Sequence, residues 1–74
     1  MFLNNLFHFK TANDCFELGR QSYNNGDHYH TVLWMAEALR KHDQENDTSI
    51  SRQEILEYLA FSTFKQGIHN LTKD

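Results

Sequence analysis

Three side chains that could hold a metal ion, Asp27, His28 and His30, occur together in the segment GDHYHTVLWM at residues 26–35. Imidazole and carboxylate groups are common ligands of zinc and iron. The apolar run that follows predicts a helix, and helical residues two apart point about 200° away from each other. His28 and His30 therefore cannot chelate one ion as neighbours, and the chain has neither an HExxH motif nor an HxD followed by a distant histidine. The pattern instead predicts a helix capped by Asp27, with surface histidines and no metal site.

Composition narrows the class of protein further. The chain has 74 residues, a net charge of −3 and one cysteine, so it forms at most one small domain without an internal disulfide. Its seven Lys and Arg residues are scattered, which argues against a nucleic-acid partner. No apolar run approaches the ~20 residues that span a bilayer. Residues 1–10 form an apolar segment, helical or loose, that lacks the features of a signal peptide.

Capping and stop signals predict an all-α fold with three main helices. The expected spans are residues 11–25, 27–42 and 51–66, with a partial fourth helix after Gly67 and a polar loop between the second and third. Thr11 can cap the first helix with Asp14 at its third position, and Ser51 with Glu54 forms a capping box. Isoleucines 50 and 55 stand where a hydrophobic staple would close. Glycines are expected to end the first and third helices.

Residues 15–39 resemble a tetratricopeptide repeat, a pair of antiparallel helices with small residues at close contacts. Leu18-Gly19 takes the leucine–glycine position of that pattern, and Gly26 the turn. A partial second copy follows 41 residues later, where Leu59, Ala60 and Gly67 match residues 18, 19 and 26. The sequence therefore predicts an incomplete tetratricopeptide-like domain over residues 11–74. Buried Cys15 and Trp34 are expected in their core.

Two stripes share the same helical phase in the two copies. Phe16, Arg20 and Tyr23 have the spacing of one helix face, and so do Glu57, Phe61 and Phe64, flanked by Tyr58. A separate set, Ile55, Leu56, Leu59 and Thr63, suffices to pack the third helix on its neighbour. The aromatic residues either line a shared groove with Arg20 and Glu57 as charged groups, or form core under a further helix. Rigid rings suit an extended, proline-rich peptide, which is ordered before binding and loses little entropy.

The segments DCFELGRQSYNNGDHYHTVLWMAEALR and EILEYLAFSTFKQG resemble the peptide-substrate-binding domain of collagen prolyl 4-hydroxylase alpha subunits. That resemblance implies a non-catalytic domain that binds proline-rich, procollagen-like peptide in a tyrosine-lined groove. Carried over by position, the groove residues are Glu57 (usually Asp in the family), Tyr58, Phe61 and Phe64. The family commonly has Tyr at position 61, and Phe there keeps the stacking face without the hydroxyl. A general tetratricopeptide scaffold that binds helical or acidic partners is the alternative.

The resemblance also implies a cellular context. The family's iron(II) and 2-oxoglutarate site, which works with ascorbate, lies in a separate catalytic domain that this chain does not contain. The family's partners are protein disulfide isomerase as beta subunit and a second alpha chain, in the lumen of the endoplasmic reticulum. The sequons at Asn46 and Asn70 would be compatible N-glycosylation sites there.

Overall fold

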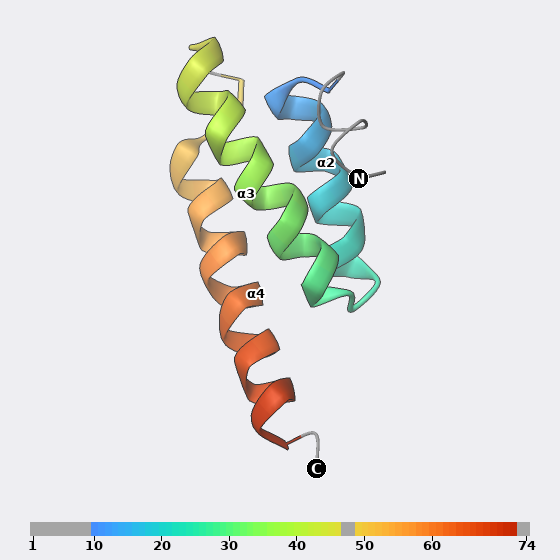
Figure 1. The fold of residues 1–74 in the computed structure, drawn as a ribbon. Helices are drawn as coiled ribbons and strands as arrows, with labels where there is room; N and C mark the ends of the chain where they lie inside the picture. The colour runs from blue at the N-terminus through green and yellow to red at the C-terminus, as the bar shows by residue number, and fades with distance from the viewer. Residues whose placement is uncertain (1–9, 47–48, 73–74) are drawn as a thin grey trace.

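The computed structural model of the chain describes residues 10–46 and 49–72, and it is helical over most of them. The prediction for residues 1–10 lies outside this range except at Lys10. The helices are α2 (Ala12–Asn24), α3 (His28–Glu45) and α4 (Arg52–Thr72). Each runs antiparallel to the one before it, so that α2 and α4 point the same way and both pack chiefly on α3 (Figure 1). The predicted all-α, tetratricopeptide-like architecture is confirmed.

The predicted helix starts follow from side-chain caps. The Asp14 backbone N–H donates to Thr11 Oγ1 at 3.1 Å, and the Thr11 N–H donates to Asp14 Oδ2 at 3.2 Å, which completes a capping box. Gly26, with φ of +75°, makes the turn into α3 in the left-handed conformation that glycine tolerates best. At α4 the Glu54 N–H donates to Ser51 Oγ at 3.3 Å. The return bond from the Glu54 carboxylate does not occur between these two described residues, and that carboxylate points elsewhere.

The core lies where α2, α3 and α4 meet. Its buried members are Cys15, Phe16, Trp34, Met35, Ala38, Ile50 and Ile55. Gly19 brings α2 close to α3, because a Cβ at this position would lie 2.7 Å from Met35 Cε. The leucine–glycine position of the repeat thus has the expected role. Cys15 and Trp34 are buried as predicted, at 0% and 7% exposure.

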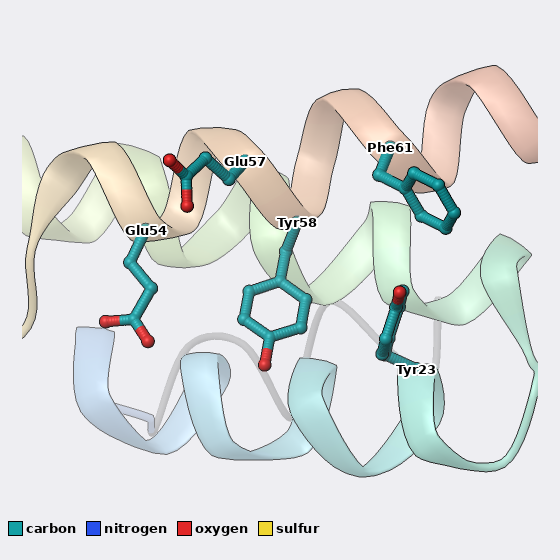
Figure 2. A pocket seen from close by; sticks show the side chains of 5 residues that line it. All are labelled: Tyr23, Glu54, Glu57, Tyr58 and Phe61. Atoms are coloured by element: carbon teal, nitrogen blue, oxygen red, sulfur yellow. The ribbon is translucent and has the colours of Figure 1, made fainter.

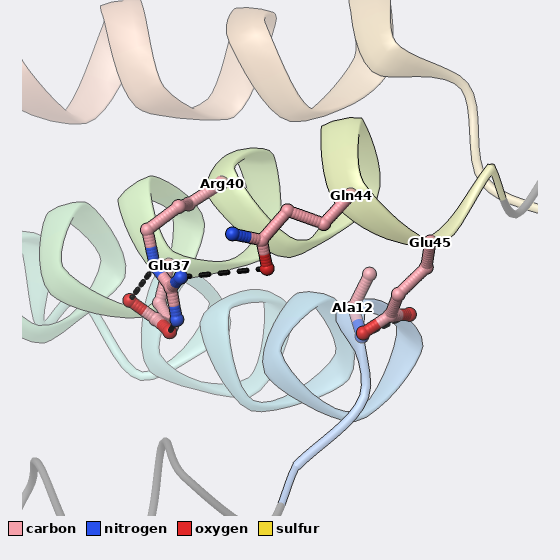
Figure 3. Close-up of polar contacts among 5 residues, drawn as sticks. All are labelled: Ala12, Glu37, Arg40, Gln44 and Glu45. Atoms are coloured by element: carbon pink, nitrogen blue, oxygen red, sulfur yellow. Dashed lines mark hydrogen bonds and ion pairs between the residues drawn. The ribbon is translucent and has the colours of Figure 1, made fainter.

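The end of α3 corrects the expected loop. This helix continues three residues beyond His42, through Asp43, Gln44 and Glu45. These polar side chains form hydrogen bonds that cannot be inferred from the lack of apolar residues in the segment. Glu45 Oε1 accepts from the Ala12 N–H at 3.1 Å, and Arg52 Nε donates to Asp43 Oδ1 at 3.1 Å. Figure 3 shows how Glu45 reaches the start of α2, beside the Glu37–Arg40–Gln44 group. Glu and Gln are also good helix formers. A carboxylate at a helix N-terminus is favourable, and here it joins α3 to α2.

The predicted partial fourth helix is wrong. Residues 68–72 continue α4, which passes through Gly67 and ends at Thr72. No proline interrupts this stretch, and Thr72 Oγ1 donates to the Ile68 carbonyl at 3.0 Å. A glycine inside a helix costs only about 1 kcal/mol, so the favourable residues on both sides carry the helix past it.

Replacing Gly67 with alanine is expected to stabilise the fold. The site is helical and exposed, and an added Cβ would meet nothing within 4 Å. Alanine therefore gains its helix propensity over glycine without a clash, which is worth about 1 kcal/mol. Urea unfolding followed by circular dichroism measures the change. Gly26→Ala is the matched control, and it should destabilise because its φ is positive. A loss of stability in Gly67→Ala would contradict the helical assignment.

The packing face of α4 also differs from the prediction. Ile55 and Ser62 are fully buried, and Leu59 is partly buried against the core. Leu56 is 37% exposed and Thr63 is exposed, so these two do not pack as predicted. Ile55, Leu59 and Ser62 have i, i+4, i+7 spacing and form one face. Residue type alone does not single out Ser62, a small polar residue, as part of the buried face.

Candidate functional site

A cavity of about 320 Å³ opens between α2 and α4. Four of its wall residues come from α4 and one from α2: Glu54, Glu57, Tyr58, Phe61 and Tyr23. Figure 2 shows Glu54 and Tyr58 directed from α4 toward α2, while Tyr23 reaches from α2 toward Phe61. The spacing of the α4 residues, i, i+3, i+4 and i+7, places them on one face of that helix. Because Ile55 and Ser62 hold α4 on α3, this face turns toward α2.

The aromatic walls of the cavity support one another. The Tyr23 ring lies edge-on to Tyr58, with centroids 5.1 Å apart at 84°, and to Phe61, at 5.8 Å and 64°. The His28 ring, at the start of α3, lies against the rings of Tyr23 and Phe61, with centroids 5.8 and 6.2 Å apart. Edge-to-face pairs of this kind add about 0.5–1.5 kcal/mol beyond the area they bury. The rings are therefore held in place before any ligand arrives.

Phe16 is a correction to the expected groove surface. Its side chain is 5% exposed and belongs to the core. The ring packs against Tyr58 from behind, with centroids 5.7 Å apart and planes at 81°. Phe16 lies seven residues before Tyr23 and shares its stripe, but a helix face can be partly buried along its length. Phe16 therefore supports the cavity wall without forming part of it.

Phe64 also departs from the expected geometry. Its ring is 61% exposed and does not line the cavity. The stripe formed by Glu57, Phe61 and Phe64 exists, but α4 extends beyond the end of α2 (Figure 1). The cavity ends where Tyr23, near the end of α2, meets Phe61.

Arg20 forms an ion pair within α2. Its Nη2 donates to Glu17 Oε1 at 3.0 Å, and its Nε donates to the same oxygen at 3.3 Å. This hydrogen-bonded pair raises the pKa of Arg20, with a smaller contribution from Tyr58. Arg20 was expected as a charged group of the groove, but it pairs with Glu17 and does not line the cavity.

Glu54 is a wall residue that the sequence did not indicate. The sequence predicts Glu54 as the partner of Ser51 in a capping box, yet its side chain lines the cavity (Figure 2). Its place three residues before Glu57 and four before Tyr58 was the available signal. Glu57, by contrast, was expected at this face and is found there, where its Oε2 accepts from Gln53 Nε2 at 3.3 Å.

The Asp27–His30 group caps α3, as the sequence predicted. Asp27 Oδ1 accepts from the His30 N–H at 3.1 Å, and Oδ2 lies 2.6 Å from His30 Nδ1. His28 instead turns toward the rings of Tyr23 and Phe61. Within residues 10–46 and 49–72, no three His, Cys, Asp or Glu side chains are grouped so that they could hold a metal ion.

Removing this cap by Asp27→Ala is expected to cost about 1 kcal/mol of unfolding free energy at pH 7. The backbone bond from His30, together with its ring, lowers the pKa of Asp27 below its usual 3.8. A lowered folded-state pKa means that the stabilisation is complete above the usual 3.8 and is lost as the pH falls from there through the lowered value. Urea titrations at pH 7 and near pH 3 should therefore show the difference shrinking in acid.

The control for this prediction is Asp43→Ala, which breaks an exposed ion pair with Arg52. Exposed pairs contribute about 0–1 kcal/mol, so the loss of unfolding free energy at pH 7 should be smaller in this variant than in Asp27→Ala. An Asp27→Ala deficit that grows in acid would contradict the capping role.

The remaining candidates lie outside the cavity. Burial raises the pKa of the Cys15 thiol to about 11, so it stays protonated and unreactive at neutral pH. Asn46 and Asn70, the two sequon asparagines, are both exposed. Asn46 ends α3 with a left-handed φ of 54°, whereas Asn70 lies within α4. No helix in the described part of the chain is long and apolar enough to cross a membrane.

Fold and comparisons together define the class of the protein. Three antiparallel helices with a glycine at the α2–α3 contact make it an all-α, tetratricopeptide-like domain. A sequence model of the prolyl 4-hydroxylase peptide-substrate-binding domain matches residues 12–73. The chain belongs to this family, and the part that matches is the peptide-binding domain, not the catalytic one.

Known relatives agree with this assignment. Prolyl 4-hydroxylase subunit alpha-2 of Gallus gallus is 53% identical over 57 residues, which are 77% of this chain and 11% of that protein. Subunit alpha-1 of Homo sapiens is 46% identical over 59 residues, 80% of the chain and 11% of the relative. Subunit alpha-1 of Caenorhabditis elegans is 50% identical over 57 residues, 77% and 10% respectively. The chain thus spans about a tenth of the length of these relatives.

Proposed function

We propose that the chain binds proline-rich, procollagen-like peptide in the cavity between α2 and α4, as the substrate-binding part of a prolyl 4-hydroxylase alpha subunit. The observation that carries the proposal is the convergence of Tyr23, Tyr58 and Phe61 on one cavity, in a member of a peptide-binding family. Aromatic faces are good contacts for proline rings, and a polyproline II segment loses little entropy on binding.

The roles within the cavity follow from its geometry. Tyr23, Tyr58 and Phe61 stack on prolines, and the hydroxyls of Tyr23 and Tyr58 can donate to peptide carbonyls. Phe61 has no hydroxyl and contributes its ring alone. Glu57 can accept a peptide N–H, and Phe16 supports Tyr58. Arg20 does not line the cavity, but its guanidinium can donate to a peptide carbonyl beside it. Phe64 lies outside the cavity and makes at most a peripheral contact.

The rest of the proposal concerns a longer polypeptide. We infer that iron(II), 2-oxoglutarate and ascorbate serve a catalytic domain elsewhere in such a subunit, which acts on the peptide held here. By the same reasoning the subunit would pair with protein disulfide isomerase and a second alpha chain in the endoplasmic reticulum. Asn46 is then the better-placed N-glycosylation site, because its sequon begins in the exposed turn after α3 rather than within a helix.

Calorimetric titration of the chain with a (Pro-Pro-Gly)-repeat peptide tests the proposal. We expect saturable binding in the micromolar to millimolar range. An amphipathic helical peptide and an acidic tail peptide represent the general scaffold alternative, and both should bind more weakly. Glu54 and Glu57 in the cavity already disfavour an acidic ligand. Binding of the helical or acidic peptide without binding of the proline-rich one would overturn the proposed function.

A further inference from the structure

The cavity between α2 and α4 has two carboxylates at one end and rings at the other. Figure 2 shows Glu54 and Glu57 on the N-terminal side of Tyr58, with Phe61 and Tyr23 on its opposite side. A proline needs only the rings. The second carboxylate, Glu54, has no role in the contacts proposed for proline or for the peptide backbone.

This acidic end is not neutralised from within the described residues. Within the described residues no ion pair involves Glu54 or Glu57, because Arg20, Arg40 and Arg52 pair with Glu17, Glu37 and Asp43 outside the cavity. The Glu57 carboxylate accepts a hydrogen bond from the neutral amide of Gln53. Two carboxylates on one helix face three residues apart repel each other, and a cation from a ligand would relieve that repulsion.

The rings add to the attraction for a cation. A guanidinium or ammonium group over an aromatic face is stabilised by the ring quadrupole. Phe61 already shows this behaviour, since Lys65 Nζ lies 5.6 Å from its ring centroid. Lys65 does not line the cavity, so it leaves the cavity side of Phe61 open to a ligand. A planar guanidinium can also pair with a carboxylate through two N–H groups.

We propose that the cavity selects proline-rich peptides with an arginine or lysine next to the ring-bound proline, and that Glu54 and Glu57 determine this specificity. The inference rests on the proposed function, because it names the class of peptide that the same cavity prefers. The proline packs on the exposed surface of the rings that line the cavity, and the adjacent cation lies along Tyr58 with its charged end at the two carboxylates. Arginine should be preferred over lysine because its fork suits carboxylates and stacks on tyrosine.

The test compares three (Pro-Pro-Gly)-repeat peptides that differ at one central residue, which is arginine, glutamine or glutamate. Dissociation constants are measured by fluorescence anisotropy at low and high salt. We expect the arginine peptide to bind about 5-fold more tightly than the glutamine peptide at low salt, and the glutamate peptide to bind most weakly. Salt at about 0.5 M should reduce the arginine preference, because exposed charges are screened.

Variants assign the preference to the two carboxylates. The double variant Glu54→Gln, Glu57→Gln should reduce the arginine-to-glutamine ratio to below about 2-fold, and Glu54→Lys should favour the glutamate peptide. Glu37→Gln, which removes one negative charge outside the cavity, should keep the full ratio. Melting curves establish that each variant is folded at the temperature of the measurement.

The outcomes separate this inference from the proposed function. Equal binding of all three peptides, or an arginine preference that survives the double substitution, overturns the inference and leaves the proposed function standing. If none of the peptides binds, the proposed function fails and the inference fails with it. A preference lost in the double variant and kept in Glu37→Gln supports both.

Discussion

Replacing Tyr58 with alanine is expected to weaken binding of a (Pro-Pro-Gly)-repeat peptide about 10-fold or more. Tyr58 stands at the centre of the cavity, where its ring contacts Tyr23 at 5.1 Å and Phe16 at 5.7 Å. Its removal deletes a stacking face and also releases Tyr23, whose orientation depends on that contact. Aromatic residues that are central and well packed carry most of the binding energy in many interfaces. Titration calorimetry measures the change.

Two variants make the Tyr58 result specific. Tyr58→Phe keeps the ring and loses one hydroxyl, so it should weaken peptide binding about 5-fold or less. Tyr29→Ala removes a 55% exposed tyrosine that does not line this cavity, and its affinity should match that of the unmodified chain. Unchanged affinity in folded Tyr58→Ala would place the peptide somewhere else.

The largest expected effect on stability is at Met35. Its side chain is fully buried against Gly19, and Met35→Ala should cost about 2–5 kcal/mol. In the unmodified chain, Gly19→Ala brings a Cβ within 3.2 Å of Met35 Cγ and Sδ and closer still to Cε. The resulting overpacking, about 1–3 kcal/mol, should outweigh the gain in helix propensity of about 1 kcal/mol.

The same glycine substitution should change sign when Met35 is already alanine. The atoms that Cβ would meet are then gone, and Gly19→Ala should stabilise by about 1 kcal/mol. Urea titrations of the two single variants and the double variant give the coupling energy, and trimethylamine N-oxide extends the measurement to weakly folded variants. Additive effects would show that Gly19 is not required for close approach of α2 to α3.

The helix starts could be predicted because each depends on a few neighbouring residues. Thr11 with Asp14, Asp27 with the His30 N–H and Ser51 with the Glu54 N–H are local contacts, readable from spacing alone. The repeat pattern identified Gly19 for a different reason, since a small residue at a fixed position of the repeat implies close approach of the second helix.

The ends of α3 and α4 depend on partners that are distant in sequence or on small differences in helix propensity. Glu45 extends α3 because it meets the Ala12 N–H, 33 residues away. Gly67 was expected to end α4, but a single glycine costs too little to stop a helix with favourable flanks.

The sequence predicts which helix faces carry the candidate site, but not which residues of those faces are buried. Helical periodicity placed Tyr23, Tyr58 and Phe61 on facing stripes, and these rings do meet. Periodicity alone could not distinguish Phe16, which is buried, from Phe64, which lies beyond the cavity. That distinction depends on where α2 ends relative to α4. The position of α2 alongside α4 also explains why Glu54 lines the cavity.

Peptide binding in the cavity between α2 and α4 is tested most directly by a chemical-shift titration of the ¹⁵N- and ¹³C-labelled chain with a (Pro-Pro-Gly)-repeat peptide. We expect saturable shifts of the ring signals of Tyr23, Tyr58 and Phe61, with much smaller shifts at Phe64 and Tyr29. Shifts concentrated at Tyr29 and Thr63, in the depression on the other side of α4, would contradict it, as would no shifts at millimolar peptide.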